Sequence, residues 1–313
     1  MYFPYLRGKQ FELLALRAFS QSNPGCESIV PIIEPVKKTT KSLEQAFSTM
    51  LECDLKFAVV LNPLDGDFKH PMVSNDIINI CPMLKDQKDS WIPAYSYRNN
   101  GSKILRLAES YDLKDLMIIF PQSIDFSNID TNDLLSNDLV RYIVISNDSR
   151  STRAKLNRRN KYVITLKDHF NTRQKNADYA DPDDEFFSDD FAFYKDDRLY
   201  GYADYTTLSK DFIEGGMLPY AIAIHLTYRN NEDEINVHHF VSDTNFDQSN
   251  IKGKFIEAAK KIAPFYEVYN LRSTSAVAEL IDRSSSEEKY PGLGYIKKLS
   301  ILNHLELINH IEH

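Results

Sequence analysis

Three short apolar runs, LMIIF (residues 116–120), YIVIS (142–146) and YVITL (162–166), decide the fold class of this chain. They are rich in β-branched and aromatic residues, which are typical of strands. They are also apolar at nearly every position instead of every second one, as expected of strands buried on both faces. Such strands are typical of parallel sheets whose connections are helices. The sequence therefore predicts β-α-β units in this region.

The same rhythm extends through the first half of the chain. Further strands are predicted at residues 2–6, 29–34, 57–61 and 91–97, and helices at 9–20, 41–51 and 103–111. Seven parallel strands with crossover helices fit a closed barrel. We therefore predict an α/β fold, an irregular TIM-like (β/α)8 barrel, with the open doubly wound sheet as the alternative.

The rhythm breaks after Lys167. Residues 178–197 contain nine acidic residues and a single lysine, Lys195, which indicates an acidic insertion at 170–198. After a strand at 200–206, a late β-hairpin is predicted from the runs 221–228 and 235–241. C-terminal helices are then predicted at 254–263, 275–282 and 295–311.

These elements predict two domains. The barrel would cover residues 1–251, including the insertion and a hairpin region at 220–243, and a C-terminal helical cap would cover 252–313. The strand that closes the barrel is either 200–206 or 220–228.

Composition excludes several classes of protein. The 313 residues are 42% hydrophobic, which is enough for a large core. The 10 glycines form neither G-x-G-x-x-G nor a P-loop, and a net charge of −8 opposes a protein that coats DNA. Three widely spaced cysteines, no membrane-length apolar run and no signal peptide predict a cytoplasmic protein without a membrane segment.

The start of the chain, YFPYLRGKQFE (residues 2–12), is followed by IIEP (32–35), and the pair resembles the bacterial "beta family" proteins. The stretches DHFN (168–171), ADY (203–205), AIH (223–225), FVSD (240–243) and PGLG (291–294) are similar to a subgroup often encoded beside a small protein similar to PD-(D/E)XK nucleases. The resemblance implies a role in defence against phage and a nuclease-like partner. It implies no particular reaction.

In a parallel barrel, active residues follow the C-terminal ends of the strands. This rule selects Glu34, Asp168 and Asp204 as candidate catalytic acid/base groups, and Lys9, Arg98 and Lys167 as candidate anion-binding residues. The three carboxylates could together hold Mg²⁺ or Mn²⁺ and so support phosphoryl or phosphodiester hydrolysis. The alternative is ordinary solvation of strand ends, with an ion pair between Arg7 and Glu34 that closes the barrel.

Two further features have competing interpretations. Residues 150–161 carry six basic residues and no acid, and could bind a phosphate, a nucleic acid or an acidic partner. They could equally be a solvated helix, or pair with the acidic insertion. His225 is predicted to be a structural histidine, and His238 and His239 point to opposite faces of a strand and so cannot pair with each other.

The sequence thus predicts an enzyme that acts on a phosphate-bearing small molecule or nucleic acid in bacterial defence, of the metal-dependent phosphohydrolase type. The alternative is a non-catalytic module that binds a nuclease-like partner protein. A barrel enzyme that uses flavin or pyridoxal is disfavoured, because no glycine-rich phosphate loop follows the last strands.

Overall fold

The computed structural model describes residues 1–69, 77–215 and 218–312, and the chain forms two compact units. The first consists of Met1–Leu13, Ser20–Lys167 and Phe193–Tyr205. The second consists of Leu14–Phe19, Asp168–Ala192 and Thr206–His313. The expected boundary at residues 251/252 is not where the units divide, because the hairpin and most of the insertion group with the C-terminal helices.

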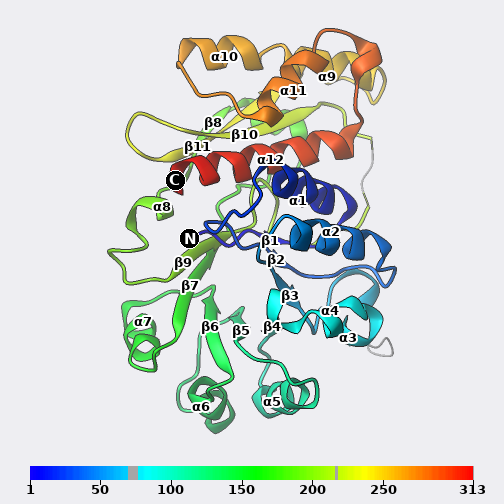
Figure 1. Ribbon diagram of the computed structural model, residues 1–313. Helices are drawn as coiled ribbons and strands as arrows, with labels where there is room; N and C mark the ends of the chain where they lie inside the picture. Colours follow the sequence, from blue (N-terminus) through cyan, green and yellow to red (C-terminus); the bar gives the residue numbers. More distant parts are fainter. Residues whose placement is uncertain (70–76, 216–217, 313) are drawn as a thin grey trace. The chain divides into compact units, whose positions relative to one another are not determined.

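The first unit is built on a parallel eight-stranded sheet (Figure 1). Its strands, in spatial order, are β1 (Tyr5–Leu6), β2 (Ile32–Ile33), β3 (Ala58–Val60), β4 (Ile92–Ser96), β5 (Leu116–Phe120), β6 (Val140–Ile145), β7 (Tyr162–Lys167) and β9 (Gly201–Asp204). A parallel bridge between Tyr2 and Tyr202 joins the two edges, and the Phe3 N–H donates to the Tyr202 carbonyl oxygen at 2.8 Å. The TIM-like barrel is confirmed, and the segment at 200–206 closes it.

Helices connect consecutive strands of the barrel, as the sequence predicts. They are α1 (Gln10–Ser22), α2 (Lys41–Glu52), α3 (Ile77–Ile80), α4 (Met83–Asp86), α5 (Gly101–Ser110), α6 (Ile129–Ser136) and α7 (Arg150–Asn157), with short 3₁₀ turns at Gly66–Phe68 and Lys88–Ser90. In α2 the buried residues Leu43, Ala46, Phe47 and Met50 recur at helical spacing, which gives the helix one apolar face. Figure 1 shows α2, α5, α6 and α7 outside the ring of strands.

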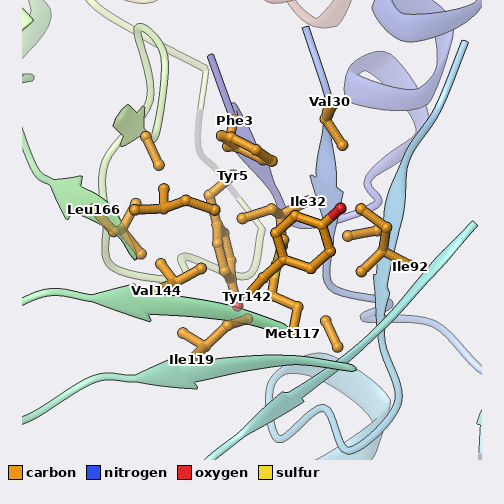
Figure 2. Close-up of a cluster of buried hydrophobic side chains, with 14 of the residues drawn as sticks. Phe3, Tyr5, Val30, Ile32, Ile92, Met117, Ile119, Tyr142, Val144 and Leu166 are labelled. Carbon is orange, nitrogen blue, oxygen red and sulfur yellow. The ribbon is translucent and has the colours of Figure 1, made fainter. Parts of the chain in front are cut away.

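Alternate residues of each strand fill the inside of the barrel (Figure 2). Phe3 and Tyr5 point inward from the first strand, and the same parity holds around the ring to Leu166 and Ala203. Residues between them point outward toward the helices. Because both faces are buried, the strands are apolar at almost every position, which explains the runs in the sequence.

The second unit contains an antiparallel sheet in the order β10 (Ala223–Arg229), β11 (Ile235–Val241) and β8 (Asp184–Ser188). Its other elements are a 3₁₀ turn (Asn176–Ala180), α8 (Asp190–Phe193), α9 (Ile251–Ala259), α10 (Ile262–Val268), α11 (Ser275–Arg283), a 3₁₀ turn (Glu287–Lys289) and α12 (Leu293–Glu312). The predicted hairpin is confirmed. The acidic insertion supplies the third strand of this sheet, β8.

The two faces of the small sheet are covered by different helices. On one face, the Asn303 side chain of α12 donates to the Thr227 carbonyl oxygen at 2.9 Å. On the other face, the Phe265 ring of α10 stacks on His238 with ring centroids 4.0 Å apart. His238 and its neighbour His239 therefore have different surroundings, as the strand period requires.

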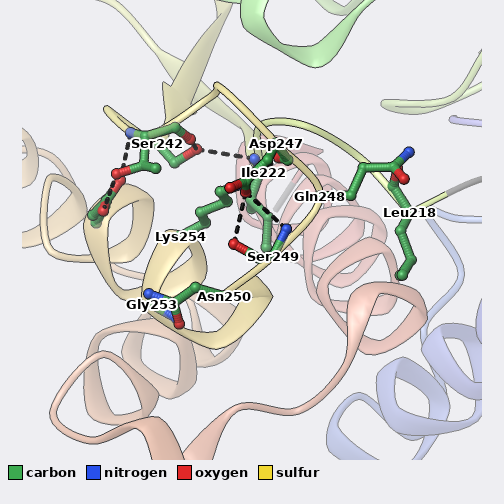
Figure 3. Close-up of polar contacts among 11 residues, drawn as sticks. Leu218, Ile222, Ser242, Asp247, Gln248, Ser249, Asn250, Gly253 and Lys254 are labelled. Atoms are coloured by element: carbon green, nitrogen blue, oxygen red, sulfur yellow. Dashed lines mark hydrogen bonds and ion pairs between the residues drawn. The ribbon is translucent and has the colours of Figure 1, made fainter.

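Polar contacts fasten the loop before α9 (Figure 3). The Asn250 side chain caps the helix by accepting from the Gly253 N–H at 3.1 Å. Lys254 is 0% exposed, and its ammonium group donates to the backbone carbonyl of Asp247. Gln248 donates to the Leu218 carbonyl oxygen at 2.6 Å.

Candidate functional site

The C-terminal rim of the barrel gathers charged side chains around Glu34. The Glu34 N–H donates to the Leu6 carbonyl oxygen at 2.8 Å, so the residue extends the ladder of β2, and only 5% of it is exposed. Its Oε2 accepts from the Tyr5 hydroxyl at 2.9 Å and from Arg7 Nη1 at 3.1 Å. Burial raises the pKa of Tyr5 well above its usual value, and the nearby Glu34 carboxylate adds to this rise.

Arg7 is shared between two carboxylates, since the same Nη1 also pairs with Asp65. Its guanidinium lies 5.5 Å from the centroid of the Tyr5 ring and 5.9 Å from that of Tyr205. Burial lowers the pKa of Arg7, but Glu34 and the other nearby groups outweigh burial and hold it above its usual value. The expected ion pair between Arg7 and Glu34 is present.

Backbone geometry positions Asp65. The next residue, Gly66, has a φ of +60°, and a Cβ there would collide with the Val36 carbonyl. Only glycine fits such a position. The chain after β3 is thus turned so that Asp65 reaches Arg7.

Arg98 is an exposed cation at the same rim. Partial burial lowers its pKa, and the negative charges of Glu34 and Asp65 oppose that shift. Its Nη1 lies 3.5 Å from the carbonyl oxygen of Asn62, whose side chain is itself held by two 2.8 Å hydrogen bonds to the Ser96 backbone. Among the described residues, Arg98 has no carboxylate within ion-pair distance.

Lys9, the second predicted anion-binding residue, lies next to a buried carboxyl group. Glu12 is 4% exposed, and burial raises its pKa to about 7, although the Arg7 N–H and the charge of Lys9 oppose the rise. Lys9 thus faces an acid of its own unit. Its anion-binding role stays a prediction.

Asp204 and Lys167 lie on the outer face of the barrel. They are register partners in β9 and β7, and each follows an interior residue, Ala203 and Leu166, by one position. Asp204 is 2% exposed, and its Oδ1 accepts from the Tyr2 hydroxyl at 2.6 Å. The convergence of Glu34 with Asp204 that we expected does not occur, because the two side chains leave opposite faces of the sheet.

Asp168 belongs to the second unit and is exposed. Burial raises its pKa, and the charge of Lys210 opposes that rise. Its neighbour His169 pairs with Asp190 through Nε2 at 2.9 Å. A catalytic role for Asp168 stays a prediction. Within the described parts of the chain, no three His, Cys, Asp or Glu side chains are arranged to hold a metal ion.

The basic stretch at 150–161 is largely satisfied within its own unit. Arg153 pairs with Asp148 at 3.3 Å and with Asp197 of the acidic insertion at 2.9 Å. Lys155 lies over the Phe126 ring, 4.6 Å from its centroid, and Lys161 donates to two backbone carbonyls. These contacts support the interpretation that the basic stretch pairs with groups of its own unit. They weaken the interpretation that it binds nucleic acid.

Sequence reasoning missed three features. Asp65 follows β3 in an irregular segment that carries no motif, and Tyr205 lies one residue beyond β9. The third is a contact between His225 and His239, which the register of the hairpin brings together. Pairing the two strands of the predicted hairpin residue by residue could have found it.

Comparisons with protein-family models, with curated proteins and with solved structures found no match to this chain. No helix in the described ranges combines the length and the apolarity that crossing a membrane requires.

Proposed function

We propose that the rim of the barrel binds a phosphate-bearing small molecule or nucleic acid and acts on it. Arg98 would hold the phosphate, and Glu34 would be the acid/base group. The observation that carries this proposal is Arg98, an exposed guanidinium at the same rim as the buried Glu34 and not paired with a carboxylate in the described structure.

The chemistry of both residues suits a phosphate ligand. A guanidinium presents its donors in a planar fork that matches two phosphate oxygens. In the described structure, both hydrogen bonds to the Glu34 side chain go to Oε2, so Oε1 remains for a proton of the ligand or of an attacking water. A carboxylate held in this way can act as a general base.

A Mg²⁺ or Mn²⁺ ion is also part of the proposal. Such ions are commonly held by one or two carboxylates together with the phosphates of the substrate. Two carboxylates of this rim, Glu34 and Asp65, both contact Arg7 and would hold the ion together with a phosphate of the substrate. The ion would polarise a phosphate oxygen when bound.

The setting that we propose, defence against phage in the bacterial cytoplasm, follows from the resemblance to beta family proteins. The three cysteines of the chain form no disulfide, which agrees with a reducing compartment.

Binding is tested by calorimetric titration of the full chain with pyrophosphate and with a short single-stranded oligonucleotide, with and without Mg²⁺. We expect Arg98→Met to weaken binding at least tenfold. Arg141→Met is the matched control, because Arg141 is also a partly exposed arginine but pairs with Asp115 at 3.2 Å. Equal affinities of the wild type and Arg98→Met would refute the proposal.

The catalytic role of Glu34 is tested by phage challenge of cells that carry the chain together with the nuclease-like neighbour that the resemblance implies. We expect Glu34→Gln to abolish protection while the purified variant still binds pyrophosphate. Unchanged protection and unchanged affinity would together remove Glu34 from the mechanism.

A non-catalytic module that binds a nuclease-like partner is the second candidate. It is favoured by the sharing of Arg7 between Glu34 and Asp65, since such a closed ion pair also serves to stabilise a rim. Co-purification of the neighbouring gene product, undisturbed by Arg98→Met and Glu34→Gln, would support this candidate over the enzyme.

A further inference from the structure

Two imidazoles of the second unit are joined by a direct hydrogen bond. His225 of β10 and His239 of β11 are cross-strand partners, and their Nδ1 atoms lie 2.8 Å apart. A neutral imidazole carries one N–H, so one Nδ1 must donate and the other must accept. The direction of this bond decides which nitrogen of each ring carries a lone pair.

We infer the direction from the charge of Glu185. His239 is 2% exposed, and its Nε2 lies 4.0 Å from Glu185 Oε1, with no hydrogen-bond partner among the described residues. A carboxylate favours an N–H over a lone pair facing it. His239 then carries its proton on Nε2 and accepts through Nδ1. His225 donates through Nδ1, and its lone pair is on Nε2.

Glu185 is itself held in place. Asn171 donates to its Oε2 at 2.6 Å, and Arg173 pairs with its Oε1. Such supporting contacts fix the orientation of the acid and hence the tautomers of both histidines.

The Nε2 of His225 is available to a reactant. His225 is partly exposed. Its Nε2 makes no hydrogen bond to a described residue and is not fully buried. The rings of Phe170 and Tyr179 pack edge-on against the imidazole, with centroids 4.9 and 4.6 Å away, and so fix its plane.

Both imidazoles are held neutral. Burial lowers the pKa of His239 to about 4, and the charges of His238 and Arg173 add to this effect against those of Glu185 and Asp184. Burial also lowers the pKa of His225 well below its usual value, with contributions from His239 and from Lys297 of α12. The lone pair is therefore not lost to a proton at neutral pH, and Lys297 supplies a positive charge that attracts anions.

We propose that Nε2 of His225 is a nucleophile that accepts a phosphoryl group. The lone pair forms the N–P bond, and the bond from phosphorus to the leaving group breaks, with its electrons departing on that group. The Nδ1 proton of His225 stays in the 2.8 Å hydrogen bond to His239, whose lone pair stabilises the positive charge that forms on the phosphorylated ring. This site lies wholly within the second unit and does not depend on the function proposed for the barrel rim.

Phosphoramidate, a small donor that releases ammonia on attack, is the probe. We expect the full chain to gain one phosphoryl group, stable to alkali and labile to acid, that mass spectrometry maps to His225. His225→Gln should abolish labelling, and Glu185→Gln should slow it about tenfold, because about 1.4 kcal/mol of lost orientation is a factor of ten in rate. His310→Gln is the control, since His310 is exposed at the end of α12 and should not affect labelling at His225.

Labelling of other histidines in preference to His225, or full labelling of His225→Gln, would overturn the proposal. A second measurement needs no variant. Nitrogen-15 chemical shifts of the wild type should show an unprotonated Nε2 in His225 and a protonated Nε2 in His239, and the reverse assignment would also overturn it. Arg98→Met should label as the wild type does, which separates failure here from failure at the rim.

Discussion

The carboxylates of Glu34 and Asp204 lie on opposite faces of the same barrel. Glu34 continues the inward parity of Ile32 and meets the interior residue Tyr5, whereas Asp204 meets Tyr2, which points outward. One carboxylate is therefore at the rim, and the other is buried on the outer face of the sheet. Asp204 is assigned a structural role on this ground.

The contact between Tyr2 and Asp204 should contribute to stability. Tyr2→Phe removes a 2.6 Å hydrogen bond to a carboxylate that is 2% exposed. We expect the free energy of unfolding to fall by about 1–3 kcal/mol, because a buried charged acceptor loses a donor. Tyr220→Phe is the matched control, because Tyr220 is 55% exposed. It should change the free energy of unfolding by less than about 0.5 kcal/mol. Urea denaturation of both variants gives the comparison, and equal losses would contradict the assignment.

Glu12 should make stability depend on pH in an unusual direction. Burial raises its pKa from the usual 4.5 to about 7, so between these values the folded chain holds a proton that the unfolded chain has lost. The free energy of unfolding then falls as the pH rises through this window, by about 3 kcal/mol from this group. In Glu12→Gln this contribution is absent. The free energy of unfolding of the variant should therefore rise relative to that of the wild type between about pH 4.5 and about pH 8, as measured by urea denaturation. A difference in unfolding free energy that stays constant over this range would contradict the raised pKa.

His239 should act in the opposite sense. Its pKa is lowered by burial from 6.5 to about 4, so between these values the unfolded chain binds a proton that the folded chain does not. The stability contributed by the neutral ring is present above pH about 6.5 and is lost as the pH falls toward about 4, by about 3 kcal/mol. The advantage of the wild type over His239→Gln should therefore shrink in acid. Unfolding curves at several pH values test this, and an advantage that grows in acid would show that His239 is charged when folded.

Lys254 should hold the loop before α9 through a backbone contact. Its ammonium group donates to the Asp247 carbonyl, while the Asp247 carboxylate is 63% exposed and 3.4 Å away (Figure 3). Lys254→Met keeps the side-chain volume but removes the donor, so amide hydrogen exchange at residues 243–250 should become at least about tenfold faster. Asp247→Asn keeps the carbonyl contact and should exchange at the wild-type rate. Equal exchange in the two variants would show that the carboxylate is the main anchor.

Much of the barrel could be predicted from local patterns. The run at 116–120 coincides with β5, because a strand buried on both faces must be apolar at each position. The strand within the acidic insertion could not be predicted from a local apolar pattern. β8 contains Asp184 and Glu185, which look like loop residues, yet the strand forms because β11 lies alongside it and Asp184 accepts from Tyr228, Asn236 and His238.

The candidate site was predicted only in part. The strand-end rule found Glu34 and Arg98, because parallel strands end at one rim whatever their order. The same rule selected Asp204, because the rule does not distinguish side chains that point into the barrel from those that point outward. In β9 both faces are buried, so the sequence GYAD carries no alternation that would reveal the inward side.

The sequence by itself determined a parallel α/β sheet and the residues at its strand ends, because burial of both strand faces and the period of a strand are local properties. Only the tertiary structure decided which carboxylate points inward, that Arg7 is shared by Glu34 and Asp65, and that His225 meets His239. These relationships depend on the register between segments that are separated along the chain. Register is set when side chains pack against one another, which no single segment encodes.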